Sequence, residues 1–131
     1  MKSLIQRILT VLARAIIKKY KPDIIGVTGS VGKTSAKDAI VCALAGNFTV
    51  RGSEKTYNNE FGVPLTVIGA RSAVWSLVGW VRVIARAVWL LLWRDASYPG
   101  ILVVEMGADK PGDIEKLVSI APPKIGVITA I

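Results

Sequence analysis

The chain has no histidine and a single cysteine, Cys42, among its 131 residues. Without histidine, Ser-His and Cys-His catalytic pairs are excluded. A lone cysteine also excludes an internal disulfide bond and a cysteine-based zinc site. We expect Cys42 to be a small apolar residue within a helix. The length predicts one domain, large enough to bury a hydrophobic core.

Acidic residues are scarce and unevenly placed, and the net charge is +8. None precedes Asp23, and none lies between Glu60 and Asp95. The 17 Lys and Arg residues include six within residues 1–21 and four within residues 71–94, and both stretches are also strongly apolar. Stretches that are both basic and apolar favour an anionic membrane surface as the partner. No RNA motif or recognition-helix pattern is visible, so we expect no nucleic-acid partner.

The first 22 residues predict an amphipathic helix that ends at Pro22. Arg7 and Arg14 interrupt any signal-peptide hydrophobic region, and no small-residue cleavage site follows. Two interpretations remain open, because such a helix either packs on its own domain or lies on a membrane surface. The predicted apolar face consists of Leu4, Ile5, Ile8, Leu9, Leu12, Ala15 and Ile16.

Residues 71–93 contain all four tryptophans and no acid, which predicts a long apolar helical insertion at the edge of the fold. Arg82 and Arg86 interrupt the apolar run, which argues against a membrane-spanning helix. The wide Trp-rich surface favours a helix lying in the lipid headgroup layer. The alternative is a long buried helix with its polar stripe in water. That stripe would consist of Ser72, Ser76, Gly79, Arg82, Arg86 and Arg94.

The motif that organises the chain is a glycine-containing loop between an apolar run, residues 24–27, and a helix-compatible segment. Strand, glycine loop and helix in this order predict a phosphate-binding loop, in which backbone amides and the helix N-terminus face the phosphates. Lys33 would reach the outer phosphates, and the Thr34 hydroxyl would bind Mg²⁺. Val27 stands where the strict G-x-x-x-x-G-K-[ST] pattern has glycine, so a glycine-rich turn with a surface lysine is the alternative. The predicted nucleotide-binding residues of this loop are Thr28, Gly29, Ser30, Val31, Gly32, Lys33, Thr34 and Ser35.

A second element of the same site is predicted where the apolar run 101–104 ends in Glu105. A continuous apolar run is typical of a buried parallel strand, and ligands of open α/β sheets bind at the carboxyl ends of the strands. We therefore predict that Glu105 binds Mg²⁺ together with Thr34, the alternative being an ordinary loop carboxylate. Further strands are predicted at 48–50 and 125–131. The sequence therefore predicts an α/β fold that resembles the P-loop NTPases, with a mainly parallel sheet flanked by helices.

Three motifs in order resemble the central ATP-binding domain of the Mur ligases. They are GVTGSVGKTS at 26–35, NNEFGVP at 58–64 and VVEMGA at 103–108. The resemblance covers residues 23–131 and implies a domain that is incomplete at its C-terminus, preceded by the helix of residues 1–22. Mur ligases normally have an N-terminal domain that binds the UDP part of the substrate, whereas only 22 residues precede the first predicted strand here.

The resemblance implies an ATP- and Mg²⁺-dependent ligase of peptidoglycan precursor synthesis in the cytoplasm. If the basic helices dock on a membrane, the protein would be peripheral to the inner membrane face. ATP would phosphorylate a UDP-muramoyl peptide-like carboxylate, and a D-alanyl-D-alanine-like amine would attack the acyl phosphate. Lys33 and Asn59 would be catalytic, and Asn58 would lie beside the phosphates. From the sequence alone, Asn58-Asn59 more simply forms a turn, and Pro64 suits the first turn of the helix that follows.

Two alternatives remain open: another phosphate-loop kinase or NTPase, and a non-catalytic, membrane-associated ATP-binding fragment. The pattern T-G-x-x-G-K-T-S and the Asn-Asn segment argue against the first. From residues 1–131 alone we expect ATP binding at most, with little or no ligase activity, because the amine-binding part of the family is not among them.

Overall fold

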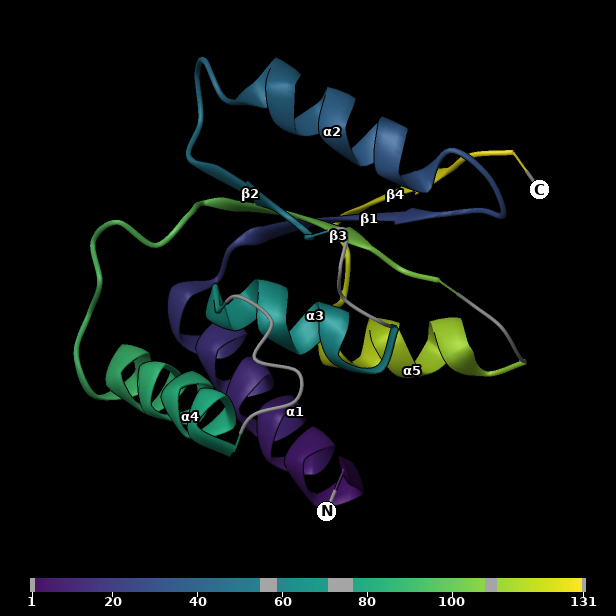
Figure 1. Cartoon of the computed structure of the whole chain (residues 1–131). Helices are drawn as coiled ribbons and strands as arrows, with labels where there is room; N and C mark the ends of the chain where they lie inside the picture. Colours follow the sequence, from purple (N-terminus) through teal and green to yellow (C-terminus); the bar gives the residue numbers. More distant parts are fainter. Residues whose placement is uncertain (1, 55–58, 71–76, 108–110, 131) are drawn as a thin grey trace.

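The computed structural model describes residues 2–54, 59–70, 77–107 and 111–130, and only the backbone of residues 2, 59 and 60. These residues form five helices and four strands (Figure 1). In order they are α1 (Lys2–Tyr20), β1 (Asp23–Thr28), α2 (Lys33–Leu44), β2 (Val50–Gly52), α3 (Asn59–Ile68), α4 (Leu77–Leu92), β3 (Ile101–Glu105), α5 (Asp113–Ile120) and β4 (Ile125–Ile128).

The four strands form one parallel sheet in the order β2-β3-β1-β4. In the centre, β1 and β3 pair from Asp23 opposite Ile101 to Val27 opposite Glu105. Leu102, Val103 and Val104 of β3 are fully buried, as expected for a parallel strand covered on both faces. The prediction of an α/β fold with a mainly parallel sheet flanked by helices is confirmed.

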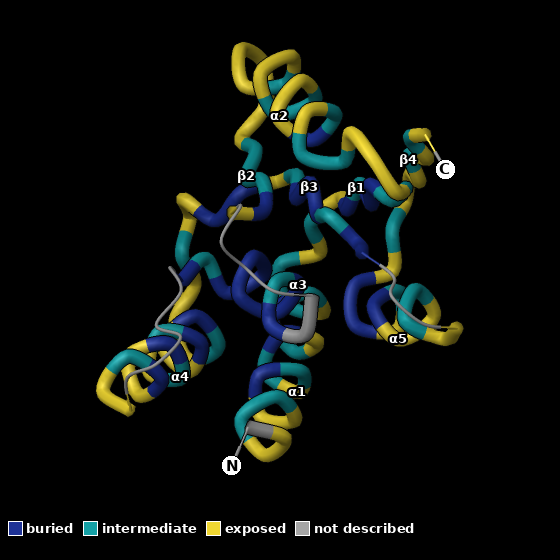
Figure 2. The backbone as a smooth tube through the Cα atoms, turned by 45° about the vertical axis from the view of Figure 1, so that its right-hand side comes forward, coloured by how far each residue is buried: buried dark blue, intermediate teal, exposed yellow. Residues whose placement is uncertain are grey.

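The helices cover the two faces of the sheet unequally (Figure 1). On one face α2 lies alone, against β1, β2 and β3. On the other face α3 packs on β3, and α1 and α5 lie beside α3. Helix α4 packs on α1 and α3, still farther from the sheet. The buried backbone is concentrated between the sheet and these four helices (Figure 2).

Helix α1 packs on its own domain. Leu9, Ala13 and Ile16 are completely buried in the main hydrophobic cluster, and Arg14 donates a hydrogen bond to the Ser119 carbonyl at 3.3 Å. The predicted apolar face is therefore used mainly for packing. Leu4 and Ile8 belong to the same predicted face but remain exposed.

The described residues do not contain the long apolar helical insertion that the sequence predicts over residues 71–93. The described helix, α4, is 16 residues long and packs on α1 and α3 rather than on a strand. Residues 71–76, which include Ser72 and Ser76 of the predicted polar stripe, lie outside the described residues. Arg86 does not face water as the predicted stripe requires, because its Nε donates to the carbonyl of Ile68 on α3 at 3.1 Å. None of the described helices has the length and apolar character needed to cross a membrane.

The ends of α3 and α4 are held by side chains from elsewhere in the chain. Lys19 Nζ donates to the carbonyl oxygens of Leu90 and Trp93 at 2.7 and 2.6 Å. This places a positive charge at the negative end of the α4 dipole. Arg51 on β2 similarly donates to the Thr66 carbonyl near the end of α3 at 3.0 Å. Because helix ends leave carbonyls without intrahelical partners, these contacts fix α3 and α4 in the fold.

Candidate nucleotide and metal site

The loop between β1 and α2 turns sharply at two glycines. Gly29 and Gly32 have φ angles of 137° and 87°, which side chains of L-residues rarely tolerate. A Cβ atom at Gly29 would also clash with Oγ1 of Thr129. Gly32 precedes the first residue of α2, Lys33. Both glycines are therefore required by the path of the loop, whatever the loop binds.

Two amides of the loop are hydrogen-bonded to the segment after β4. The Ser30 N–H donates to the Ala130 carbonyl at 2.9 Å, and the Val31 N–H donates to the same oxygen at 3.4 Å. The Thr129 hydroxyl donates to the Val31 carbonyl at 2.7 Å. We had expected successive loop amides to face inward toward a phosphate, and in this structure the amides of Ser30 and Val31 instead face Ala130.

The N-terminus of α2 provides further amide donors. The first amide bonded to this end of the helix is that of Ala36, which donates to the Gly32 carbonyl at 2.9 Å. The amides of Lys33, Thr34 and Ser35 precede it, and at this position of a helix they have no carbonyl of the same helix to bind. Amides at a helix N-terminus and the positive end of the dipole together form a favourable anion site.

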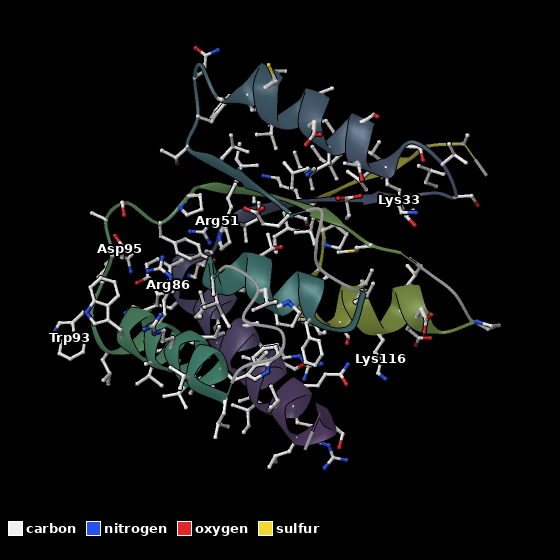
Figure 3. The ribbon with its side chains drawn as sticks, in the orientation of Figure 1. Lys33, Arg51, Arg86, Trp93, Asp95 and Lys116 are labelled. Atoms are coloured by element: carbon white, nitrogen blue, oxygen red, sulfur yellow. The ribbon has the colours of Figure 1, made fainter. Side chains whose placement is uncertain are left out.

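Lys33 lies over the glycine loop (Figure 3). Its Nζ donates to the Gly29 carbonyl at 2.7 Å, which holds the ammonium group at the mouth of the loop. The side chain is half-buried. A lysine in this position can exchange its contact with the carbonyl for one with a phosphate oxygen, because an ionised acceptor makes the stronger hydrogen bond.

Thr34 and Glu105 come together from the two sides of the site. The Thr34 hydroxyl donates to Oε1 of Glu105 at 2.8 Å. Glu105 is the last residue of β3 and pairs with Val27, one residue before the end of β1, so its carboxylate lies where the loop begins. A hydroxyl and a carboxylate side by side are hard oxygen ligands of the kind that Mg²⁺ prefers. Mg²⁺ usually takes its remaining ligands from water and phosphates, so this donor set fits the ion.

A buried lysine that we did not single out from the sequence adjoins this pair. Lys37 Nζ donates to the Ser53 carbonyl at 2.6 Å and lies 2.9 Å from Oδ1 of Asp38 and 3.8 Å from Oε2 of Glu105. The Ser53 hydroxyl in turn accepts a hydrogen bond from the Glu105 amide at 3.0 Å. Lys37 therefore joins α2, the end of β2 and Glu105. The sequence feature that points to Lys37 is its position four residues after Lys33, which places both lysines on the same face of the helix.

The two predicted asparagines are not placed by the structure. Asn58 lies outside the described residues. Asn59 is the first residue of α3, and only its backbone is described. The predicted roles of both asparagines therefore remain predictions.

A parallel sheet with a glycine loop, a lysine and a Thr-Glu pair at the carboxyl ends of its central strands defines an α/β domain with the architecture of a nucleotide-binding protein. No protein-family model matches the chain. Among curated proteins it is 38% identical over 105 residues to the UDP-N-acetylmuramoyl-tripeptide–D-alanyl-D-alanine ligase of Mycobacterium leprae. It is 32% identical over 120 residues to the ligase of the same name from Bacillus subtilis.

Comparison of the fold with solved structures also points to the Mur ligases. The structure superposes on the MurF ligase of Thermotoga maritima in complex with ADP with a TM-score of 0.70 and 29% identity, over 96% of this chain. The chain is thus a homologue of the Mur ligases, related to part of the UDP-N-acetylmuramoyl-tripeptide–D-alanyl-D-alanine ligases. It spans 16% of the M. leprae relative, 21% of the B. subtilis relative and 24% of the T. maritima chain.

Proposed function

We propose that this chain is the central ATP-binding domain of an ATP-dependent carboxylate–amine ligase of peptidoglycan precursor synthesis. The observation that carries the proposal is the 2.8 Å contact between the Thr34 hydroxyl and Glu105, beside the loop covered by Lys33. The ADP in the T. maritima neighbour supports a nucleotide as ligand. The names of the curated relatives support a muramoyl tripeptide and D-alanyl-D-alanine as the joined substrates.

In this proposal the loop binds the phosphates as a P-loop. The amides of Gly32, Lys33, Thr34 and Ser35 donate to phosphate oxygens at the N-terminus of α2. The Lys33 ammonium offsets the charge of the transferring phosphoryl group. Thr28 and Gly29 begin the loop, and the amides of Ser30 and Val31 join the site when the contact with Ala130 opens.

Thr34 and Glu105 would hold Mg²⁺, which supplies positive charge that stabilises the phosphoryl group in transfer. Lys37 would position Glu105, because its ammonium lies 3.8 Å from Oε2, whereas the Thr34 hydroxyl donates to the other carboxylate oxygen, Oε1. Asn58 and Asn59 would donate side-chain amides to phosphate or acyl oxygens.

The proposed reaction has two steps. A carboxylate oxygen of a UDP-muramoyl peptide attacks the γ-phosphorus and displaces ADP, forming an acyl phosphate. The amine of a D-alanyl-D-alanine-like substrate then attacks the acyl carbon, inorganic phosphate leaves, and the amine loses a proton. Both substrates are cytoplasmic in this proposal, and so is the domain.

The loop assignment is tested by nucleotide binding to the 131-residue chain. Lys33→Ala should weaken Mg-ATP binding about tenfold or more in calorimetric titration, because a charge-assisted contact with phosphate is lost. Lys116→Ala is the matched control, since this exposed lysine lies on α5 across the sheet (Figure 3). Unchanged affinity in Lys33→Ala would overturn the assignment.

The ligase chemistry is tested separately, on a longer protein that contains this chain and its amine-binding part. ATP turnover should require both a muramoyl peptide carboxylate and an amine. Turnover that needs neither would favour another phosphate-loop NTPase, and turnover with one hydroxyl acceptor alone would favour a kinase.

A further inference from the structure

Helix α4 has two apolar faces, and only one of them is covered. The buried face consists of Trp80, Val83, Ala87 and Leu90. A second apolar stripe lies on another side of the helix, and its residues are spaced by four, four, three and four positions. This stripe is exposed to solvent (Figure 2). Its members are Leu77, Val81, Ala85, Val88 and Leu92. A helix that packs only on its own domain needs one apolar face, so the second stripe calls for a partner.

Other large apolar side chains on and just after α4, and on the neighbouring helix α1, are also exposed. Trp89 and Trp93 are 45% and 58% exposed beside the stripe. On the neighbouring helix α1, Leu4 and Val11 are 60% and 64% exposed. We call the exposed apolar residues of α1 and α4 together the α1–α4 face.

The charge on these two helices has one sign. Neither α1 nor α4 contains an acidic residue. Arg7 and Lys18 on α1 and Arg82 on α4 are exposed, as is Arg94 just after α4. Arg94 lies with its guanidinium 5.5 Å from the Tyr20 ring centre, so it is held near the end of α4.

We propose that the α1–α4 face docks on the surface of an anionic lipid bilayer. Apolar side chains would enter the headgroup layer, Trp89 and Trp93 would occupy the interface that tryptophan favours, and the surrounding cations would pair with lipid phosphates. The face would lie flat on the membrane.

The charges favour a membrane over a second copy of the chain. A two-fold dimer through this face would bring the cations of one copy near those of the other, and neither α1 nor α4 has an acid to pair with them. Docking here would also leave the nucleotide site accessible, because Trp93 and Lys33 lie on opposite sides of the molecule (Figure 3). A membrane-docked domain could therefore still exchange nucleotide with the solution.

The test is co-sedimentation of the 131-residue chain with vesicles of pure phosphatidylcholine and with vesicles containing about one-third phosphatidylglycerol. We expect binding to the anionic vesicles, at least about tenfold weaker binding to the neutral ones, and weakening with added salt. Val81→Glu and Trp89→Gln should each weaken binding about tenfold, and Arg82→Gln about fivefold.

Two exposed residues far from the face provide matched controls. Phe48→Glu introduces an acid at an apolar side chain that is 56% exposed after α2, and Lys116→Gln removes one cation from α5. Both should bind vesicles like the parent chain. Urea unfolding monitored by circular dichroism verifies that each variant is folded. If Val81→Glu does not fold, vesicle binding by Trp89→Gln provides the test instead.

Three results would overturn the proposal. They are equal binding to neutral and anionic vesicles, no binding to either, and equal loss of binding in Phe48→Glu and Val81→Glu. Concentration-dependent dimerisation in analytical ultracentrifugation, abolished by Val81→Glu and without vesicle binding, would assign the face to self-association instead.

Discussion

The two faces of the sheet differ in what they bury. The face under α1, α3, α4 and α5 holds the hydrophobic cluster, and no residue of α2 belongs to it. On the opposite face, the only buried residue of α2 is a lysine, Lys37. One face therefore provides the apolar burial that stabilises the fold, whereas the other holds charged groups against the carboxyl ends of the strands. The residues that stabilise the fold and the residues of the candidate site therefore lie on opposite faces of the sheet.

The alternation of β3 assigns residues to the two faces. Leu102 and Val104 belong to the hydrophobic cluster, whereas Val103 does not. Successive side chains of a strand point to opposite faces, so Glu105 shares the side of Val103, toward α2. Its contact with Thr34 follows from this alternation. A shift of β3 by one residue would move the carboxylate into the apolar layer.

The largest effect should come from a cavity in the apolar layer. Ile16 on α1 is completely buried, and Ile16→Ala should lower the free energy of unfolding by about 3 kcal/mol because it loses apolar burial and leaves a void. The same change on α2, Ile40→Ala, should cost about 1 kcal/mol, since Ile40 is only half-buried. Urea unfolding followed by circular dichroism measures both. Equal losses would mean that the two faces contribute alike to stability.

The next effect tests the polar layer. Lys37→Met should lower the free energy of unfolding by about 2 kcal/mol, because it leaves the Ser53 carbonyl without its donor and Glu105 without its nearby cation. Asp38→Asn is the control. Its carboxylate pairs with Lys37 but is 55% exposed, so we expect a change of about 0.5 kcal/mol or less. A stable Lys37→Met variant would show that the lysine contributes nothing to the fold.

Much of the polar face could be predicted because its signals are local. The glycines, Lys33 and Thr34 stand within one short segment of strand, loop and helix, and Glu105 ends an apolar run. The carboxyl ends of parallel strands meet at one edge of the sheet, so these residues were expected to lie together. The structure brings Thr34 and Glu105 into contact.

The apolar layer was harder to predict, because tertiary contacts decide it. The pattern of residues 71–93 could not reveal that Arg86 would bind the end of α3 or that Lys19 would bind the end of α4. Pro64 was expected in the first turn of a helix, yet α3 begins at Asn59. Pro64 lies within that helix and is completely buried. Tertiary packing outweighs the local preference of proline there.

Tyr98 provides a pH test of the apolar layer. Its hydroxyl donates to the Val67 carbonyl at 2.6 Å, and burial raises the pKa of Tyr98 to about 12. The unfolded chain should lose this proton near pH 10, so Tyr98 favours the folded state fully below pH 10 and progressively less between pH 10 and 12. Within that window its contribution should fall by up to about 1.4 kcal/mol per pH unit.

The measurement compares the parent chain with Tyr98→Phe, because lysines also titrate in this range. Both chains are unfolded in urea at several pH values from 9 to about 12, a range that includes the Tyr98 pKa of the unfolded chain and that of the folded chain. The difference in their free energies of unfolding should shrink as the pH rises. A constant difference would show that the Tyr98 pKa is the same in the folded and unfolded chains.

The smallest effect is expected on the exposed side of α2. Cys42 is exposed, so Cys42→Ser should change the free energy of unfolding by less than about 0.5 kcal/mol. On the other side of the sheet Ala87 is completely buried, and Ala87→Ser should cost about 1 kcal/mol, because its hydroxyl leaves water for an apolar site. A thiol reagent should modify Cys42 in the native chain without denaturant. If Cys42 reacted only on unfolding, α2 would have a covered outer surface, and the contrast between the two faces would disappear.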